Sequence, residues 1–249
     1  MALVPIKCPH CASTKVNKAG KINKTKKQRY HCQNESCKKH FLSEYTNKAC
    51  DPNIRAKIYL MTVNGNGTRA IARSLEISPQ TVTSALREIE VDLWFVNYDY
   101  INQHNANGMD IDIVPVDEAE MDEMWSFVHD KSQQYWLWWA IDHNTGVPLA
   151  FCFGTREYKY LDELLILLAP FNIQTVYTDD NPAYDLKITH SWLITGKAST
   201  QRIERKHLSL RTWCSRLVRK GIRFSKRHDM HVIVIALIIN FWFFSRVLW

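Results

Sequence analysis

The sequence predicts a multidomain α/β protein, in which two small N-terminal modules precede a larger α/β domain and an apolar C-terminal helix. Three observations predict this organisation. Two close pairs of cysteines lie within the first 37 residues, residues 52–90 have the pattern of three short helices, and alternating strand and helix patterns begin at about residue 117. A chain of 249 residues is long enough for one good core together with such modules.

The cysteine pairs predict a zinc ribbon over residues 1–48. Two residues separate Cys8 from Cys11, four separate Cys32 from Cys37, and 20 residues lie between the pairs. Two such pairs can close a tetrahedral thiolate site for a structural Zn²⁺. The odd total of seven cysteines fits a metal site in a reducing cytoplasm better than a disulfide framework. The histidines that could compete as ligands are His10, His31 and His40.

Lysines and one arginine crowd the segment between the cysteine pairs, where they are suited to DNA phosphates. Contacts of this kind position a protein on DNA without reading its sequence. The candidates for such contacts are Lys24, Lys26, Lys27 and Arg29.

Residues 49–95 have a helix-turn-helix pattern. Asn64-Gly-Asn-Gly67 interrupts one helix, and Ser78-Pro79 supplies a good N-cap with a proline in the first helical position of another. Side chains near the start of that last helix would read bases in the major groove. A small helical bundle without a role in DNA binding is the alternative. The candidate DNA contacts are Arg69, Gln80, Thr81, Thr83, Ser84 and Arg87.

Residues 96–116 are rich in asparagine, lack a sustained period and are expected to form a linker. An α/β domain is expected over residues 117–227, because strand patterns at 121–128, 134–142, 147–153 and 174–178 occur with helix patterns at 160–169 and from 200 to about 219. The apolar tail, 228–249, is too short to span a bilayer. We expect it to pack in the core, with a contact between subunits as the alternative.

The charge distribution favours a polyphosphate partner. Residues 1–48 carry +9 and residues 186–249 carry +11, whereas residues 110–185 carry −12 within a chain of net charge +7. Lysines and arginines that neutralise phosphates release condensed counterions. An acidic segment can face such a partner when divalent metal ions occupy it. Charge runs can also be solvated faces.

Three spaced carboxylates, Asp122, Asp179 and Glu204, are candidates for holding two divalent metal ions, Mg²⁺ or Mn²⁺. Asp179 follows a predicted strand, and ligand sites in α/β sheets form at that end. Asp122 and Glu123 are adjacent on a strand and point to opposite faces, so the pattern leaves open which of them faces the metals. Asp142 and Asp180 are further carboxylates of the same kind.

The predicted helix from residue 200 could carry both a metal ligand and phosphate contacts. Glu204, His207 and Arg211 share one face of it at spacings of three and four residues. A solvent-exposed Glu with an Arg seven residues later is also common by chance. The basic candidates for a DNA cradle are Arg205, Arg211 and Arg216.

Five segments carry a resemblance to a known family. They are Cys-Pro-x-Cys, Asn-Gly-x-Gly-x-Arg-Ala-Ile-Ala-Arg, Asp-Glu-Met-Trp-Ser-Phe-Val, Tyr-Thr-Asp and Ile-Glu-Arg-Lys-His-Leu-Ser-Leu-Arg, in this order. Over nearly its whole length the chain resembles transposases of the bacterial insertion sequence one family. Their short spacing between the last two acidic residues is similar to the 24 residues that separate Asp179 from Glu204.

The resemblance implies a DDE transposase with a ribonuclease-H-like catalytic domain. It maps the metal ligands onto Asp122, Asp179 and Glu204, with Arg211 as the basic residue that follows the Glu. It also implies that the zinc ribbon and the helix-turn-helix bind terminal inverted repeats.

The expected activity is two-metal cleavage of double-stranded DNA at those repeats, followed by strand transfer to target DNA. Because paired ends must be joined in concert, we expect a homodimer or a higher homo-oligomer. We expect no membrane association and a cytoplasmic, nucleoid-associated location in a bacterium or archaeon. The alternatives are a non-catalytic DNA-binding regulator, a simple metal-dependent nuclease, and covalent catalysis through Tyr177 or Tyr184.

Overall fold

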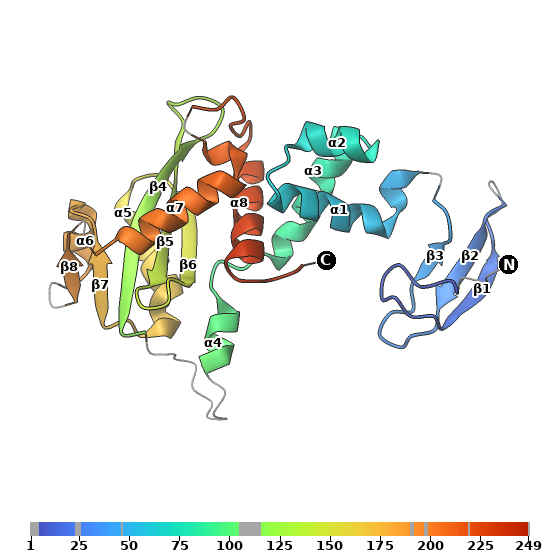
Figure 1. The fold of residues 1–249 in the computed structure, drawn as a ribbon, viewed down its shortest axis with the longest axis horizontal. Coiled ribbons are helices and arrows are strands. Elements are labelled where there is room, and N and C mark those ends of the chain that lie inside the picture. Colours follow the sequence, from blue (N-terminus) through green and yellow to red (C-terminus); the bar gives the residue numbers. More distant parts are fainter. Residues whose placement is uncertain are drawn as a thin grey trace.

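The computed structural model describes residues 5–22, 26–45, 47–104, 116–189, 192–196, 199–218 and 220–248. Along the chain come a small sheet, a cluster of short helices and a larger sheet with helices on both faces (Figure 1).

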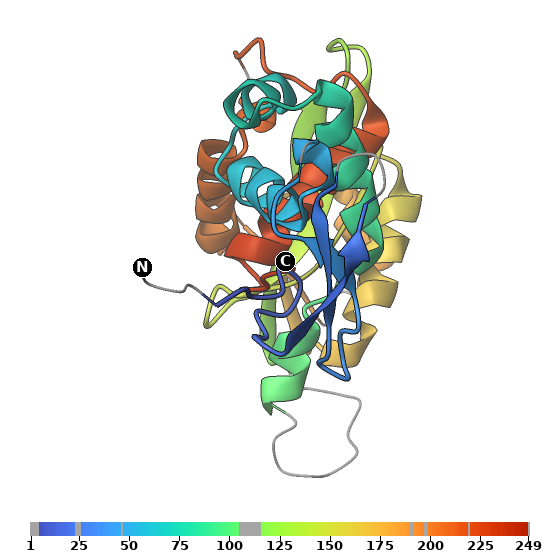
Figure 2. The same cartoon turned by 90° about the vertical axis from the view of Figure 1, so that its right-hand side faces the viewer.

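The N-terminal module is an antiparallel sheet of β1 (Val16–Lys21), β2 (Gln28–Cys32) and β3 (His40–Leu42). Figure 1 shows it beyond the end of the helical cluster, apart from the larger sheet, and in Figure 2 it lies in front of the other elements. Among the described residues its buried core consists of Cys8, Tyr30, Cys32 and Phe41. So small an apolar core needs a further cross-link, because little surface is removed from water.

The predicted cluster of three short helices is present, as α1 (Pro52–Val63), α2 (Thr68–Leu75) and α3 (Pro79–Glu88), with η1 (Lys48–Cys50) before them and η2 (Ile89–Asp92) after them. Ser78 caps α3 by accepting a hydrogen bond from the Thr81 backbone N–H at 3.0 Å. Gly65 adopts φ +80°, and a Cβ there would lie 2.9 Å from the carbonyl oxygen of Trp213. Glycine is therefore needed for the close approach of this turn to the backbone of Trp213.

The larger sheet has the order β6-β5-β4-β7-β8, in which β4, β5 and β6 are antiparallel and β7 and β8 run parallel to β4. This is the ribonuclease-H-like arrangement that the resemblance implies. Its strands are β4 (Glu118–Phe127), β5 (Gln134–Asp142), β6 (Pro148–Gly154), β7 (Thr175–Thr178) and β8 (Leu193–Thr195).

The two faces of this sheet have separate cores. On one face, Met121 and Trp138 pack with α5 and α6. On the other, Met124 and Trp139 pack with α7, α8 and the cluster of α1 to α3. The helices are α5 (Tyr158–Leu168), α6 (Pro182–Lys187), α7 (Gln201–Trp213) and α8 (His228–Trp242), with η3 (Ala169–Phe171) and η4 (Ser215–Leu217) between them.

The apolar tail is the central helix of the molecule. Ten of the 15 residues of α8 are buried, and the helix packs against α1, α3 and α7 (Figure 1). This confirms the expectation that the tail packs in the core. Asn240, which interrupts the apolar run, is fully buried and exchanges two hydrogen bonds with the Trp94 backbone, at 3.0 and 2.8 Å.

Two expectations about secondary structure were wrong. Residues 98–104 form α4 (Tyr98–His104), so the segment expected to be a linker begins as a helix, whose first turn is held by the buried side chain of Asn97. Residues 105–115 of that segment lie outside the described residues. The helix expected to reach about residue 219 ends at Trp213, where Cys214 becomes extended. Within the described ranges, none of the helices is long and apolar enough to cross a bilayer.

Candidate catalytic and DNA-binding site

The parallel pairing of β4 with β7 brings the predicted carboxylates together. Glu120 lies opposite Tyr177 in the register, so Asp122 on β4 and Asp179 just after the end of β7 each follow two residues later. Oxygen atoms of Asp122, Glu123 and Asp179 all lie within 4.8 Å of one another. Glu204, in the first turn of α7, is exposed and lies outside that tight group.

Asp122 lies on the α7 side of the sheet, in an environment that disfavours its charge. Its Oδ1 accepts a hydrogen bond from the Glu123 backbone N–H at 2.7 Å, and its Oδ2 lies 3.5 Å from Nδ1 of His207. Burial raises the pKa of Asp122 to about 7, and the charges of Glu123, Asp179 and Glu204 also raise it. A cation at this position would stabilise the carboxylate that burial and its neighbours destabilise.

A buried pair on the same face fixes the orientation of His207. The indole N–H of Trp139 donates to Nε2 of His207 at 2.8 Å, and the two rings stack with centroids 5.5 Å apart. Because Nε2 accepts, a neutral His207 carries its proton on Nδ1, which faces Asp122. Trp139 and His207 thus hold a donor toward the carboxylate of Asp122.

Glu123 points to the opposite face, and its oxygens are already engaged. Oε1 accepts hydrogen bonds from Arg156 at 3.2 Å and Asn181 at 2.7 Å, and Oε2 accepts one from the hydroxyl of Tyr184 at 3.0 Å. The side chain of Glu123 is 3% exposed. The sequence left the choice between Asp122 and Glu123 open, and these contacts favour Asp122 as the carboxylate that is free to bind metal.

The segment after β7 is organised around Asp179. The Asn181 backbone N–H donates to Oδ1 of Asp179 at 3.1 Å, while the Asn181 side chain caps α6 at Ala183 and donates to Glu123. No sequence motif pointed to Asn181 or Arg156 as part of the site. A usable signal existed for Arg156, because it is one of three basic residues in the strongly acidic stretch 110–185.

The other two candidate carboxylates, Asp142 and Asp180, lie in different environments. Asp142 is buried and organises the turn after β5, accepting hydrogen bonds from the Tyr100 hydroxyl and the Asn144 backbone N–H, each at 2.9 Å. Asp180 is exposed.

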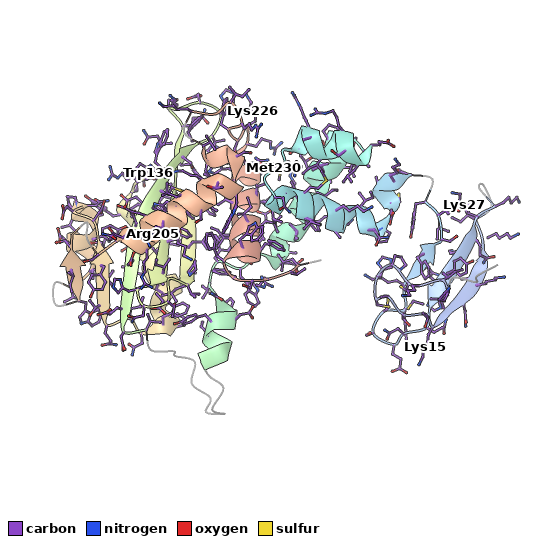
Figure 3. The ribbon with its side chains drawn as sticks, in the orientation of Figure 1. Lys15, Lys27, Trp136, Arg205, Lys226 and Met230 are labelled. Carbon is purple, nitrogen blue, oxygen red and sulfur yellow. The ribbon has the colours of Figure 1, made fainter. Side chains whose placement is uncertain are left out.

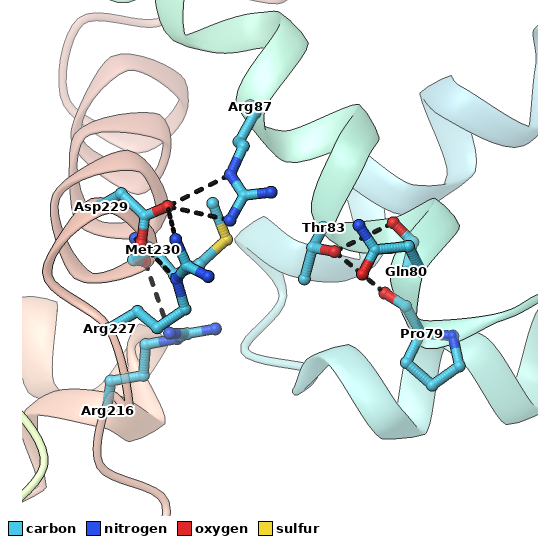
Figure 4. Close-up of polar contacts among 8 residues, drawn as sticks. All are labelled: Pro79, Gln80, Thr83, Arg87, Arg216, Arg227, Asp229 and Met230. Carbon is cyan, nitrogen blue, oxygen red and sulfur yellow. Dashed lines mark hydrogen bonds and ion pairs between the residues drawn. The ribbon is translucent and has the colours of Figure 1, made fainter.

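The predicted DNA contacts in the helical cluster divide into two groups. Arg69, Gln80 and Ser84 are exposed, and Thr81 and Thr83 are partly buried. Arg87, by contrast, donates from Nε and from a terminal nitrogen to Asp229 on α8, both at 3.1 Å (Figure 4). Its guanidinium group joins α3 to α8 in this structure, which argues against a DNA contact by Arg87.

The basic candidates elsewhere divide in the same way. Arg205 is exposed on α7, and Lys15 and Lys27 project from the small sheet at the other end of the molecule (Figure 3). Lys15, Lys26 and Arg29 are exposed, whereas Lys27 and Arg211 are partly buried. Lys24 lies outside the described residues.

Arg216 was expected to contact DNA because it lies in a basic segment, but its guanidinium group contacts other parts of the protein. Its guanidinium donates to Ser225 Oγ at 3.2 Å. It also donates to the Met230 carbonyl at 3.4 Å, a contact that Figure 4 shows. Burial lowers its pKa. The group lies within the protein, which argues against a phosphate contact there.

The four cysteines of the ribbon converge as predicted. The sulfurs of Cys8 and Cys37 lie 3.8 Å apart, those of Cys11 and Cys32 lie 3.5 Å apart, and all four lie within 4.8 Å of one another. A tetrahedral Zn²⁺ with bonds of about 2.3 Å requires sulfur separations of about 3.8 Å. The group fits a structural zinc ion, and among the described residues it contains these four ligand atoms without His10, His31 or His40.

Two family profiles match the chain. The profile described as IS1 transposase matches residues 116–245, and that of the InsA N-terminal domain, a zinc ribbon, matches residues 1–38. The chain is 46% identical over 122 residues to the insertion element iso-IS1n protein InsB of Shigella dysenteriae, which covers 49% of this chain and 93% of that protein. It is 40% identical over 122 residues to IS1 InsB proteins of Shigella sonnei and Escherichia coli K12, with 93% and 73% of those proteins covered.

Comparison with solved structures finds weaker likenesses. The catalytic core domain of BIV integrase is 14% identical with a TM-score of 0.34, covering 50% of this chain and 82% of that one. A chain of the simian T-cell lymphotropic virus intasome, in complex with PP2A regulatory subunit B56 gamma, is 13% identical with a TM-score of 0.37, covering 75% and 67%.

The IS1 profile spans more than half of the chain and includes all three predicted carboxylates, and the alignment with InsB covers nearly the whole of that relative. The chain therefore belongs to the IS1 transposase family and is a DDE-type DNA transposase.

Proposed function

We propose that this transposase binds the terminal inverted repeats of its element and cuts and joins DNA at two Mg²⁺ or Mn²⁺ ions held by Asp122, Asp179 and Glu204. One observation carries the assignment of residues. Oxygen atoms of Asp122 and Glu123 on β4 and of Asp179 after β7 lie within 4.8 Å of one another. This group lies beside α7, the helix that carries Glu204. The raised pKa of Asp122 in this group supports a site that is completed by cations.

Bound divalent ions would activate the attacking oxygen and stabilise the leaving oxygen of an in-line displacement at phosphorus. In the first step water attacks, and the bond from phosphorus to the 3′-oxygen of the element breaks. In the second, the freed 3′-hydroxyl attacks a target phosphodiester, so one phosphodiester bond forms as another breaks. Asp122, oriented by His207, and Asp179, oriented by Asn181, supply fixed oxygens for both steps.

Covalent catalysis by tyrosine is disfavoured by the settings of both candidates. Tyr184 is fully buried and donates to Glu123, and burial raises its pKa well above the usual range. Tyr177 donates to Glu118 at 3.1 Å, and desolvation raises its pKa too. A nucleophilic phenolate is therefore unfavourable at both positions.

We assign DNA binding to basic and polar side chains of the ribbon, of α2 and α3, and of α7. Arg205 and Arg211 would reach phosphates near the scissile bond, because they lie on the same helix as Glu204. Arg87 and Arg216 hold elements of the protein together in this structure and are left out of the proposed contacts. The assigned set is Lys24, Lys26, Lys27, Arg29, Arg69, Gln80, Thr81, Thr83, Ser84, Arg205 and Arg211.

The proposed assembly is a homodimer or higher homo-oligomer, because two DNA ends must be joined in concert. A location in the cytoplasm on nucleoid DNA follows from the substrate.

Strand transfer with a pre-cleaved, labelled element end tests the assignment. Purified protein, Mg²⁺ and supercoiled plasmid should give joined product, and Asp122→Asn, Asp179→Asn and Glu204→Gln should each abolish it while gel-shift binding of the end persists. Asp180→Asn is the matched control, since Asp180 adjoins Asp179 and is exposed. Joining by the Asp179→Asn protein would contradict the assignment.

The same reaction separates the alternatives. A product that is cut but never joined would indicate a simple nuclease. Binding without cutting or joining, in Mn²⁺ as well as Mg²⁺, would favour the non-catalytic DNA-binding regulator.

A further inference from the structure

Glu120 is a buried carboxylate that connects the strand of Asp122 directly to the helix of Glu204. It is 1% exposed and lies on the same face of β4 as Asp122, two residues earlier. Its Oε2 accepts a hydrogen bond from the backbone N–H of Ile203 at 2.9 Å. Ile203 immediately precedes Glu204, so one carboxylate links the segments that carry the first and third proposed metal ligands.

The second oxygen of Glu120 is also engaged. Oε1 accepts from Nδ1 of His143 at 2.8 Å, and the His143 ring packs on Tyr177 of β7 with centroids 4.5 Å apart. The carboxylate therefore joins α7 to β4, to the turn after β5 and, through this ring contact, to the strand that precedes Asp179. A buried carboxylate is tolerated when its oxygens are hydrogen-bonded in this way.

The start of α7 depends on contacts from outside the helix. Within the described part of the chain, Thr200 provides no side-chain cap for the first turn. The backbone N–H groups of a first helical turn have no acceptors within the helix, and a carboxylate there also interacts favourably with the helix dipole. Glu120 takes the place of a capping side chain, and Arg202 adds a contact with the Asn144 carbonyl oxygen.

We propose that Glu120 is a positioning residue of the transposase, which fixes Glu204 relative to Asp122 by anchoring the first turn of α7. The inference rests on the proposed function, because it assumes that Glu204 is the third ligand. Glu204 is exposed and lies outside the tight group of carboxylates, so the position of its backbone decides whether its side chain reaches a shared cation. Without the Glu120 anchor, Glu204 would meet the other ligands less often, and binding of divalent cations would weaken.

The test compares Glu120→Ala and Glu120→Gln with Glu118→Ala in the full-length protein. Glu118 lies two residues earlier on the same strand face, but its carboxylate accepts from the Tyr177 hydroxyl and is not the acceptor for Ile203. The measurements are the joining rate with a pre-cleaved end, the affinity for that end, and Mn²⁺ binding to the protein followed through the spin-resonance signal of free Mn²⁺.

For Glu120→Ala we expect the joining rate and the Mn²⁺ affinity each to fall about 10- to 100-fold, as is typical when a group that orients a metal ligand is removed. Affinity for DNA should change less than about twofold, because Glu120 is buried. Glu120→Gln keeps an acceptor for the Ile203 N–H and should recover much of the loss. Glu118→Ala should bind Mn²⁺ like the parent.

Three results would overturn the inference: a parental rate and Mn²⁺ affinity in Glu120→Ala, a slower rate with unchanged Mn²⁺ affinity, or an equal loss of Mn²⁺ affinity in Glu118→Ala. If circular dichroism shows that Glu120→Ala does not fold, the Mn²⁺ affinity of Glu120→Gln becomes the test. We then expect Glu120→Gln to bind Mn²⁺ more weakly than the parent, and an unchanged affinity would contradict the inference. Glu204→Gln distinguishes failure of this inference from failure of the proposed function, because joining by that variant would refute the proposed function.

Discussion

Asp122→Asn should make the metal-free transposase more stable while abolishing its activity. The side chain of Asp122 is 16% exposed, and its burial, with the charges of Glu123, Asp179 and Glu204 nearby, raises its pKa from 3.8 to about 7. At neutral pH and without a cation, the folded protein must therefore hold a carboxylate where water and countercharge are scarce. The amide of Asn has nearly the same shape and carries no charge.

The size and sign of the effect follow from this pKa difference. A folded-state pKa above the unfolded value means that the native protein binds the extra proton between about pH 4 and pH 7, so stability falls as the pH rises through that range. At about 1.4 kcal/mol per pKa unit, the ceiling on the loss is about 4 kcal/mol above pH 7. About 2–3 kcal/mol of this should develop between pH 5 and pH 8.

Urea unfolding followed by tryptophan fluorescence measures the difference. The nine tryptophans all lie outside residues 1–48, so the signal reports on the helical cluster and the catalytic domain. Divalent cations other than the zinc of the ribbon are omitted. The stability advantage of Asp122→Asn should grow from pH 5 to pH 8, and Mg²⁺ should stabilise the parent alone. An advantage that is independent of pH, or no advantage, would refute the reasoning.

Four further outcomes are expected. Cys32→Ser should lose about one equivalent of zinc, measured by metal analysis, without shifting the tryptophan unfolding transition, because the ribbon has its own core. Arg87→Ala and Asp229→Ala, with their double mutant, should give a coupling energy of about 0.2–1 kcal/mol in urea unfolding, since the pair is partly exposed; a coupling of zero would mean that the pair adds nothing. Asn240→Leu should destabilise by about 2–4 kcal/mol, because two backbone groups lose their buried partner. Burial lowers the pKa of His231 to about 3, so NMR should find it neutral down to about pH 4, and its contribution to stability should be lost as the pH falls from 6.5 toward 3.

Local patterns were sufficient for much of the fold. The Ser78-Pro79 start of α3 and the paired cysteines are signals that a few neighbouring residues define, and the structure has both where they were expected. Other elements lack such a signal. Strand β8 has only three residues and forms by pairing with β7, from which a helix separates it in the sequence. Three residues are too few to show a periodic pattern.

The candidate site shows the same division. Position after a strand predicted Asp179, and helical spacing predicted that Glu204, His207 and Arg211 lie on one face. Whether a basic side chain faces DNA or the protein was not predictable in this way. Arg87 lies among candidate DNA-binding residues, yet its partner Asp229 is 142 residues away in the sequence and only folding brings the two together. Arg216 lies in a basic segment, and its partner Ser225 is only nine residues away, but no local pattern indicates their contact.

The sequence by itself predicted the cysteine site, the family and the three candidate carboxylates, because short motifs of fixed residue types carry the cysteine pairs and the resemblance onto which those carboxylates map. Tertiary structure decided which carboxylate faces which partner. The pairing of β4 with β7 and the packing of α6 and α7 on opposite faces engage Glu123 with Tyr184 and leave Asp122 beside His207. Alternation along a strand predicts that neighbouring side chains point to opposite faces of the sheet. The contacts that each side chain makes depend on the elements that pack on its face.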